Sequence, residues 1–253
     1  MKQFQDQVAI VTGAGQGIGL EICRQLARQG ADVILNDVDV SMAEEAASSI
    51  QGEGGSCIAY PGDAANVAFI QKMTSDTVNK FGKLDVAIAN AGITLFGDFF
   101  DYKPEDFNTV MNLNLTGSFF LAQSAAKHMR EKKTKGRILL MSSVTGHQAH
   151  KNLAAYGMSK AALEMLARTL VIELSPYQIT INAIAPGATL TERTMRDSNY
   201  EAVWQKITPT GRPCTTADIA HAALFLTSPY AGQITGQTLV IDGGWTSTSP
   251  SPY

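Results

Sequence analysis

The sequence predicts an α/β protein built on a single doubly wound parallel sheet of about seven strands, with helices on both faces. Short apolar runs suited to buried strands alternate with segments of helical apolar spacing along the whole chain. The first apolar run, residues 8–11, leads through a glycine-rich turn into a helix. The composition is that of a globular protein, with 45% apolar residues and a formal net charge of −3.

Each element is predicted from its local pattern. Strands are expected at residues 8–11, 33–37, 57–60, 84–89, 136–141, 179–184 and 239–241. Helices are expected at residues 20–27, 41–51, 66–81, 104–132, 154–174 and 218–227, with a break near residues 112–114. Ser41 can cap the second helix, with Glu44 as its capping-box partner. Residues 189–207 are amphipathic at best and are expected to be mobile, and the tail at 246–252 is expected to be coil.

Composition and organisation exclude several classes of protein. No linker, repeat or charge block divides residues 1–253, so we expect a single domain. The mild acidity gives no reason to expect a nucleic-acid partner or a membrane surface. Neither a signal peptide nor a membrane span is indicated. The three cysteines, Cys23, Cys57 and Cys214, are widely spaced and far from histidines, which indicates reduced thiols, no metal site and a cytoplasmic location.

The turn after the first strand predicts a phosphate site. Gly13, Gly17 and Gly19 let the backbone approach a pyrophosphate that a Cβ atom would push away. The helix that follows presents unpaired amides and the positive end of its dipole. Asp37 ends the second strand about 20 residues later, where a carboxylate can bind the ribose of a dinucleotide.

Further polar residues follow other strands of the predicted sheet. In such sheets a ligand lies outside the carboxyl ends of the strands. These positions hold Asp63, Asn90, Ser143, Pro186 and Gly187. Taken singly, Asp63 and Asn90 are equally compatible with turns, and Ser143 with a cap. Their shared place at strand ends favours a site.

Tyr156 and Lys160 are four residues apart on a predicted helix and therefore share a face. Spacing alone is also compatible with a solvated pair. A phenol titrates near pH 10, and a nearby ammonium favours the phenolate. Tyr156 could then exchange a proton with an alcohol or a ketone, while the Ser143 hydroxyl holds the substrate oxygen.

These motifs together resemble the short-chain dehydrogenase/reductase family, which has the Rossmann fold. The resemblance rests on Thr12-Gly13-x-x-x-Gly17-x-Gly19, Asn90-Ala91-Gly92, Asn114, Ser143, Tyr156-x-x-x-Lys160, Pro186-Gly187 and Asp242-Gly243-Gly244. It spans nearly the whole chain and fits the compact single-domain branch. The resemblance therefore implies that residues 1–253 form a single dinucleotide-binding catalytic domain, with a mobile substrate lid around residues 188–210. Ala89 departs from the pattern, because the family usually has a second asparagine there.

The resemblance implies a role for each motif. Tyr156 would be the general acid/base, Ser143 would orient the carbonyl or alcohol, Lys160 would hold the ribose and tune Tyr156, and Asn114 would position a water. Cofactor contacts would come from Gly13, Gln16, Gly17, Ile18, Gly19, Asp37, Asp63, Ala64, Asn90, Ala91, Gly92, Tyr156, Lys160, Pro186, Gly187, Thr189 and Thr191. The family also implies a homotetramer.

We expect NAD(H) to be preferred over NADP(H). Asp37 would accept hydrogen bonds from the ribose hydroxyls and repel a 2′-phosphate. Val38 and Asp39 follow it, and Gln16 is neutral, so no cation is at hand for NADP.

The substrate stays open between two classes. Within the family the chain is similar to bacterial glucose 1-dehydrogenases and to 3-oxoacyl-acyl-carrier-protein reductases, so a sugar or a 3-oxoacyl thioester is expected. The pocket would be formed by residues 93–96, 144–153 and 189–207. Two alternatives are an inert NAD-binding sensor or scaffold, which would not need Ser143, Tyr156 and Lys160 together, and a sugar-nucleotide epimerase, which would need a further substrate domain.

Overall fold

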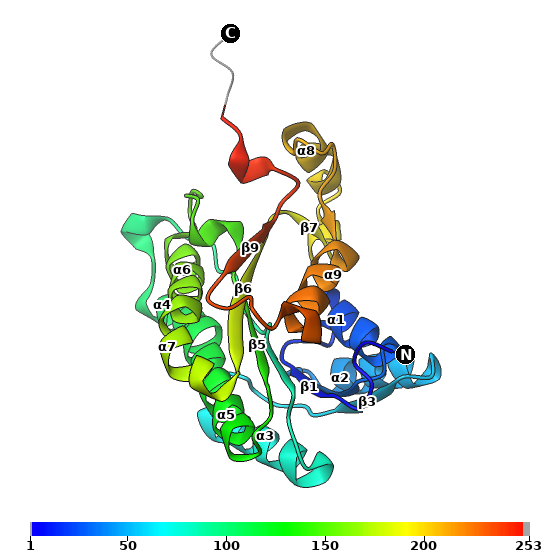
Figure 1. Ribbon diagram of the computed structural model, residues 1–253. Coiled ribbons are helices and arrows are strands. Elements are labelled where there is room, and N and C mark those ends of the chain that lie inside the picture. Colours follow the sequence, from blue (N-terminus) through cyan, green and yellow to red (C-terminus); the bar gives the residue numbers. More distant parts are fainter. Residues whose placement is uncertain (1, 250–253) are drawn as a thin grey trace.

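The computed structural model describes residues 2–249 and contains the predicted parallel sheet (Figure 1). Its strands are β1 (Val8–Val11), β2 (Asp32–Leu35), β3 (Ser56–Ala59), β4 (Val86–Ala89), β5 (Arg137–Met141), β6 (Thr180–Pro186) and β9 (Thr238–Ile241). The seven strands lie in the order β3-β2-β1-β4-β5-β6-β9, and every pair is parallel. The predicted fold class is therefore confirmed. The order reverses at β1 and β4, and a crevice for a ligand opens at such a point in parallel sheets.

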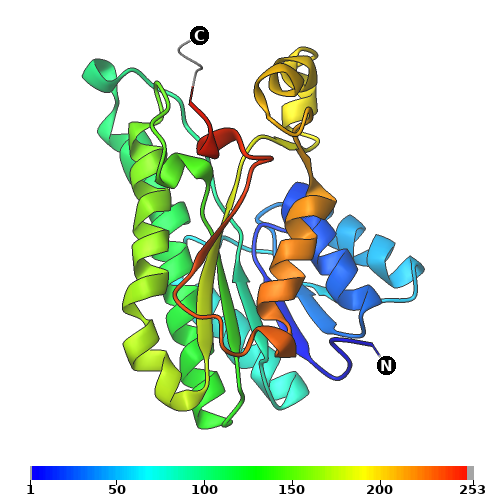
Figure 2. The same ribbon diagram turned by 45° about the horizontal axis from the view of Figure 1, so that its top comes forward.

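Helices cover both faces of the sheet (Figures 1 and 2). One face carries α1 (Gly17–Arg28), α2 (Val40–Gly52) and α9 (Thr216–Thr227). The other carries α3 (Val67–Phe81), α4 (Pro104–Met111), α5 (Ser118–Glu131), α6 (Ala154–Thr169) and the short α7 (Val171–Leu174). Two parallel neighbouring strands need a crossover connection, which is usually a helix packed on the sheet, so helices on the faces of a parallel sheet are expected.

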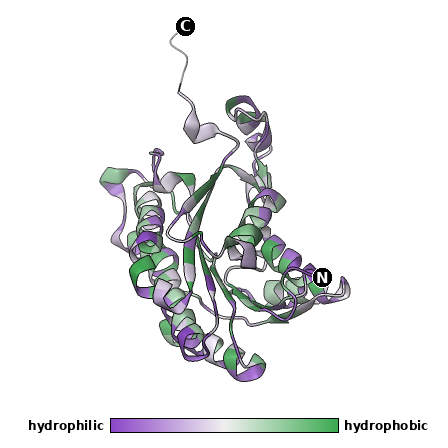
Figure 3. Ribbon diagram, viewed as in Figure 1, coloured by the Kyte–Doolittle hydropathy of each residue, from purple (hydrophilic) through white to green (hydrophobic). Residues whose placement is uncertain are grey.

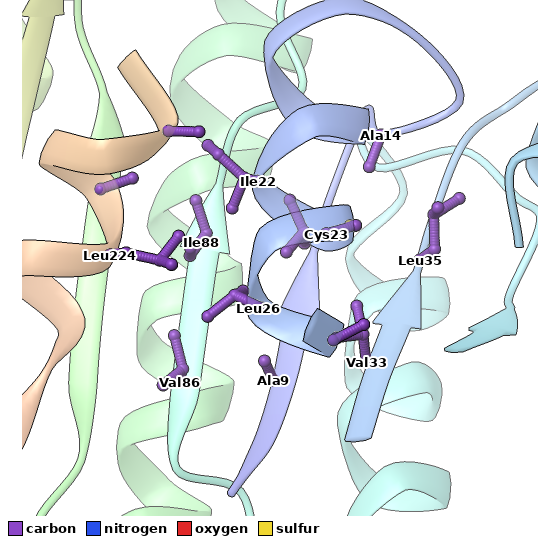
Figure 4. Close-up of a cluster of buried hydrophobic side chains, with 14 of the residues drawn as sticks. Ala9, Ala14, Ile22, Cys23, Leu26, Val33, Leu35, Val86, Ile88 and Leu224 are labelled. Atoms are coloured by element: carbon purple, nitrogen blue, oxygen red, sulfur yellow. The ribbon is translucent and has the colours of Figure 1, made fainter. Parts of the chain in front are cut away.

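Alternating side chains of each strand build a core on each face. In β1, Ala9 and Val11 pack under α1 and α9, whereas Val8 and Ile10 face α3 and α5. Figure 4 shows the first of these cores, where Ile22 and Leu26 of α1 lie over β1 and β4. Figure 3 shows apolar residues along the central strands, while the outer helices mix apolar and polar residues. The strands read as continuous apolar runs because both of their faces are buried.

The second helix begins differently from the prediction. Asp39, not Ser41, is its N-cap, and the Asp39 side chain accepts a hydrogen bond from the Met42 amide at 3.0 Å. Ser41 lies inside the first turn of the helix. Both residue types can cap a helix, and the chain leaving β2 reaches the helix two residues earlier than the sequence pattern indicates.

Three further segments refine the predictions. The expected break in the helix at residues 104–132 is a π-helical stretch, Asn112–Gly117, that joins α4 to α5. Residues 189–207 have regular structure: β7 (Thr189–Leu190) pairs with β8 (Cys214–Thr215), and α8 (Tyr200–Ile207) follows. The tail contains a 3₁₀ turn, Trp245–Ser247, instead of coil from residue 246, and residues 250–252 of the predicted coil lie outside the described residues.

Candidate active site

The glycine turn is held against β4 by hydrogen bonds from Asn90. The Asn90 side-chain amide donates to the carbonyls of Thr12 and Gly13 at 2.9 and 2.7 Å. Gly13 has a φ of 61°, and a Cβ atom there would lie 2.6 Å from the Ala91 Cα. A side chain at Gly13 would therefore be strained and would separate the two strand ends. Asn90 lines the cavity and also acts as the turn residue that its position suggested.

Helix α1 presents a bare amino end to this turn. No side chain caps it at Gln16, and its first turn has no acidic residue. Its amides and dipole are therefore available to an anion. A cavity of about 460 Å³ opens above them, within the range of about 300–1,000 Å³ that is usual for cofactor sites.

This cavity brings together nearly all of the residues that the sequence analysis singles out. Its lining includes Gly13, Gln16, Gly17, Ile18, Gly19, Asp37, Asp63, Ala64, Asn90, Ala91, Gly92, Ser143, Tyr156, Lys160, Pro186, Gly187, Thr189 and Thr191. The carboxyl ends of six strand regions thus meet at one hollow, as the topology requires. Asn114 is the exception.

Asn114 lies behind the cavity wall and is fully buried. Its Oδ1 accepts from the Ile93 amide at 2.7 Å, and its Nδ2 donates to the Ile93 carbonyl at 3.0 Å and to Ser159 Oγ at 3.1 Å. Gly92 separates Asn114 from Lys160, since a Cβ there would lie 3.2 Å from Asn114 Oδ1 and 3.3 Å from Lys160 Nζ. Asn114 therefore fixes the backbone after β4, and a water between it and Lys160 remains part of our proposal.

Tyr156 and Lys160 lie on one face of α6, one turn apart. Lys160 Nζ is 5.5 Å from the centre of the Tyr156 ring and donates to the Met141 carbonyl at 2.7 Å. Only 3% of Lys160 is exposed. Burial lowers the pKa of the Lys160 ammonium, and the nearby Tyr156 hydroxyl opposes that shift. The structure therefore does not show a solvated Tyr156–Lys160 pair.

Ser143 stands at the end of β5, where the chain enters a 3₁₀ turn, Val144–Gly146. Its side chain accepts from the Thr145 amide at 3.3 Å, and its carbonyl accepts from the Gly146 amide at 2.8 Å. The serine is nearly buried and lines the cavity. It acts as a cap and also stands at the site.

The far wall of the cavity comes from the end of β6. A Cβ atom on Gly187 would lie 2.7 Å from the Asp242 Cβ, so Gly187 lets the chain after β9 pack closely. The Gly187 amide donates to the Ile241 carbonyl at 2.8 Å. Asp242 in turn accepts from the amides of Gly244 and Thr246. The two glycine motifs near the C-terminus thus support one wall.

Sequence reasoning missed several residues that line the cavity, namely Asn36, Leu113, Met141 and Ser142. It included Glu192, Arg193 and Tyr200 only as members of the expected 189–207 segment. Glu192 and Arg193 reach the cavity from the chain between β7 and α8, and Tyr200 reaches it from the first position of α8. A Cβ on Gly17 would lie 3.5 Å from Thr191 Cγ2 and 3.6 Å from Glu192 Oε2, so this segment lies over the glycine turn. No local pattern places these residues, because the pairing of β7 with β8 brings them there.

The expected substrate pocket is divided between two hollows. Thr94 and the lid residues line the cavity described above, whereas residues 97–100 and 148–154 line a second hollow of about 510 Å³. Aromatic contacts connect the lid to the second hollow. The centre of the Trp245 ring lies 5.2 Å from that of His150, which lines this hollow, and 5.2 Å from that of Trp204 in α8. Figures 1 and 2 show α8 and the C-terminal segment beyond the carboxyl ends of the strands.

Comparisons with known proteins show the family to which the chain belongs. The family described as enoyl-(acyl carrier protein) reductase matches residues 13–246. Tetrahydroxynaphthalene reductase of Pyricularia oryzae is 34% identical over 95% of this chain and 90% of its own, and versicolorin reductase 1 of Aspergillus parasiticus is 35% identical over 96% and 97%. These relatives are reductases, so the class is that of oxidoreductases.

Solved structures give the same result. A short-chain dehydrogenase/reductase from Serratia marcescens superposes with a TM-score of 0.91 at 32% identity, over 96% of this chain and 99% of its own. A gluconate 5-dehydrogenase from Burkholderia cenocepacia, in complex with NADP and tartrate, superposes with a TM-score of 0.90 at 31% identity, over 98% and 99%. The chain belongs to the short-chain dehydrogenase/reductase family, whose members bind a nicotinamide cofactor.

Among residues 2–249, no helix combines the length and the apolar character that a membrane crossing requires.

Proposed function

We propose that this protein is an NAD(H)-dependent oxidoreductase that interconverts a secondary alcohol and a ketone, with Tyr156 as general acid/base. The observation that carries the proposal is the buried Lys160 ammonium, 5.5 Å from the Tyr156 ring, in the same cavity as the glycine turn. Burying a cation costs free energy that pairing or hydrogen bonds must offset, and Lys160 Nζ donates to the Met141 carbonyl rather than to a carboxylate.

The residues present fit a nicotinamide dinucleotide. The glycine turn leaves the start of α1 open to a pyrophosphate, because Gly17 has a φ of 62° and no side chain in that space. Asp37, Asp63 and Ala64 would surround the adenosine, and Thr189 and Thr191 the nicotinamide end. When bound, the nicotinamide supplies or accepts the hydride.

The chain's own groups handle the proton. Tyr156 Oη gives a proton to the carbonyl oxygen during reduction and takes it back during oxidation. The Lys160 ammonium stabilises the phenolate form, and its bond to the Met141 carbonyl keeps it beside the ring. Ser143 Oγ holds the substrate oxygen next to Tyr156. Asn114 would hold a water that connects Lys160 to solvent.

NAD(H) is the preferred cofactor in this proposal. Asp37 Oδ2 accepts from the Gly15 amide at 2.9 Å and Oδ1 from the Asp39 amide at 3.1 Å, which holds the carboxylate at the adenosine end of the cavity. A 2′-phosphate there would meet a like charge. A relative has been solved in complex with NADP, so membership of the family does not select NAD, and this preference rests on Asp37 and on Val38.

The substrate is a small ketone or alcohol, and the protein works as a cytoplasmic homotetramer with one catalytic domain and a lid at residues 188–210. A sugar and a 3-oxoacyl thioester remain the expected classes. The relatives named for naphthalene and versicolorin substrates add fused aromatic ketones, and the Trp204–Trp245 pair at the rim offers them aromatic contacts.

The test is NADH and NAD absorbance with a panel of compounds in the parent and in Tyr156→Phe. The panel contains glucose, acetoacetyl thioesters, hydroxynaphthalenones and simple secondary alcohols. We expect turnover of at least one compound by the parent and a loss of about 10²–10⁴-fold in Tyr156→Phe, because only the ionisable hydroxyl is removed. NADH fluorescence should show unchanged cofactor binding in the variant.

Tyr177→Phe is the matched control, since Tyr177 is exposed and does not line the cavity. Activity of Tyr156→Phe within about threefold of the parent would remove Tyr156 as the acid/base. NADH binding without turnover of any compound would favour the sensor alternative.

A further inference from the structure

A buried carboxylate lies directly behind the proposed catalytic residues. Glu164 follows Lys160 by four residues on α6 and therefore continues the face that carries Tyr156 and Lys160. Only 7% of Glu164 is exposed, and it does not line the cavity. The proposed proton chemistry gives this group no role.

Two side chains of the neighbouring loop bind the carboxylate. Ser142 Oγ lies 2.8 Å from Glu164 Oε1, and His147 Nδ1 lies 3.2 Å from the same oxygen. An ionised carboxylate only accepts, so both partners donate to it. Ser142 Oγ also lies 3.0 Å from the Lys160 carbonyl, but it has a single hydrogen to give. The charge-assisted bond to Glu164 is the stronger of the two alternatives.

These two donors stand on either side of Ser143 and its turn. Ser142 immediately precedes Ser143, and His147 follows the 3₁₀ turn Val144–Gly146. Between them, a Cβ atom on Gly146 would lie 2.7 Å from Glu164 Oε1 and 3.0 Å from Ser142 Oγ. Glu164 therefore contacts the turn at both ends and along its inner side.

The fold alone does not require a carboxylate at this position. A buried charge is costly to desolvate, and an apolar residue of similar volume commonly stabilises a core equally well or better. What an apolar residue cannot provide is a fixed direction for Ser142 and His147. The buried carboxylate thus lowers the stability of the fold but fixes the geometry of the loop next to Ser143.

We propose that Glu164 is a positioning residue that fixes the turn after β5 through Ser142 and His147, and so aims Ser143 Oγ at the substrate oxygen. This inference rests on the proposed function, because it assigns Glu164 to the same reaction. It predicts that loss of Glu164 affects kcat, while cofactor binding changes little, because the pyrophosphate and adenosine contacts lie at the other end of the cavity.

Steady-state kinetics of Glu164→Leu and Glu164→Gln test the catalytic part. We expect kcat to fall by about 10–100-fold in Glu164→Leu, with KM for NADH within about twofold of the parent. Glu164→Gln keeps an acceptor oxygen and should recover kcat to within about threefold. Glu173→Leu, at an exposed position of α7, is the matched control and should leave kcat unchanged.

Ser142→Ala provides a second variant that does not alter the helix. If Glu164 acts through Ser142, then Ser142→Ala also lowers kcat, and the double variant is no worse than the more damaging of the two single variants. A fully multiplicative double variant would contradict the route through Ser142. A kcat within about twofold of the parent in both single variants would overturn the proposal.

Amide hydrogen exchange gives a readout that needs no turnover. The Gly146 and His147 amides donate to the carbonyls of Ser143 and Val144 within the turn. We expect faster exchange at residues 142–148 in Glu164→Leu and unchanged exchange in β1 and α1. A parent that turns over no compound would contradict the proposed function alone, and unchanged exchange in the loop would then still overturn the role of Glu164.

Discussion

Asp37 illustrates how one side chain connects backbone geometry to ligand choice. Its two carboxylate oxygens each accept a backbone amide, one from the glycine turn and one from the start of α2. A Cβ on Gly15 would lie 2.9 Å from Asp37 Oδ2, so the turn and the carboxylate are packed together. The carboxylate is thereby held at the edge of the cavity, which Asp37 lines.

Replacing Asp37 should change which dinucleotide the protein uses. We expect the parent to favour NAD over NADP by at least about tenfold in kcat/KM, which is about 1.4 kcal/mol. The double variant Asp37→Ala with Val38→Arg should lose or reverse this preference, because a cation replaces an anion beside the ribose. Val38 is largely exposed at the cavity edge, so a longer side chain has room.

Val38→Ala alone is the control for that experiment and should keep the parent's preference. Equal use of both cofactors by the parent, or an unchanged ratio in the double variant, would show that Asp37 does not select the ribose. Either result leaves the acid/base assignment of Tyr156 untouched.

At the scale of elements, α9 has the most complete cap among the helices of the described residues. Thr215 accepts from the Asp218 amide at 3.2 Å, and Asp218 accepts from the Thr215 amide at 2.8 Å. Arg212 also binds the carboxylate. The Arg212 guanidinium holds the pKa of Asp218 well below its ordinary value of 3.8, with the Thr215 bonds assisting against desolvation.

This cap should contribute a stability that depends on pH. A carboxyl whose pKa is lowered by folding stabilises the protein above its ordinary pKa, and that stability is lost as pH falls below it. We expect Asp218→Asn to lower the free energy of unfolding at pH 7 by about 1 kcal/mol, since the cap and a partly exposed ion pair are both weakened. The difference from the parent should shrink below about pH 4 in urea titrations.

Asp101→Asn, at an exposed position, is the control and should follow the parent at every pH. A difference between Asp218→Asn and the parent that stays constant down to pH 3 would contradict a pKa lowered by folding.

The same elements show what a sequence can and cannot predict. The strands were predictable because burial on both faces of the sheet requires continuous apolar runs. The glycine turn was predictable because it directly follows the first of these runs. The π-helical stretch was only a suspected break, since the local sequence does not show its close packing: a Cβ on Gly117 would collide with the Ala64 carbonyl oxygen. Helix α8 had no core-facing pattern, because Val203 and Ile207 are themselves exposed.

The site followed the same rule. The four-residue spacing of Tyr156 and Lys160 is enough to place them on one helix face. The residues that follow the strands lie together because the carboxyl ends of parallel strands are at the same edge of the sheet. Glu192, Arg193 and Tyr200 depend on how the segment after β6 folds back over the glycine turn. Asn114 shows the opposite case, where a residue taken from a motif lies behind the wall rather than in it.

Over the whole molecule, apolar side chains remain exposed on the helices of one face. Met158, Met165 and Ile172 follow one another at intervals of seven residues along α6 and α7, and Ile172 is 83% exposed. Phe107 of α4 and Phe119 of α5 are partly exposed. A stripe of this kind beyond the core-facing side is typical of a helix that a second subunit covers.

Light scattering should therefore give a mass about four times that of the 27.0 kDa chain. We expect Met165→Glu with Ile172→Glu to reduce this mass, because two charges would be placed in the buried interface. Phe100→Glu, an exposed residue of the loop after β4, is the control and should keep the parent's mass. A parent that remains at 27.0 kDa at micromolar concentration would remove the homotetramer.

The packing of Gly187 against Asp242 has a consequence for how the protein is made. Synthesis delivers the chain from its amino end, so the glycine turn, Tyr156 and Lys160 leave the ribosome well before β9. Until β9 pairs with β6 and Asp242 packs against Gly187, nothing supports the wall of the cavity that the end of β6 forms. A nascent chain stopped before β9 would thus carry every proposed catalytic group and still lack a finished cavity, which makes the last strand the step that completes maturation.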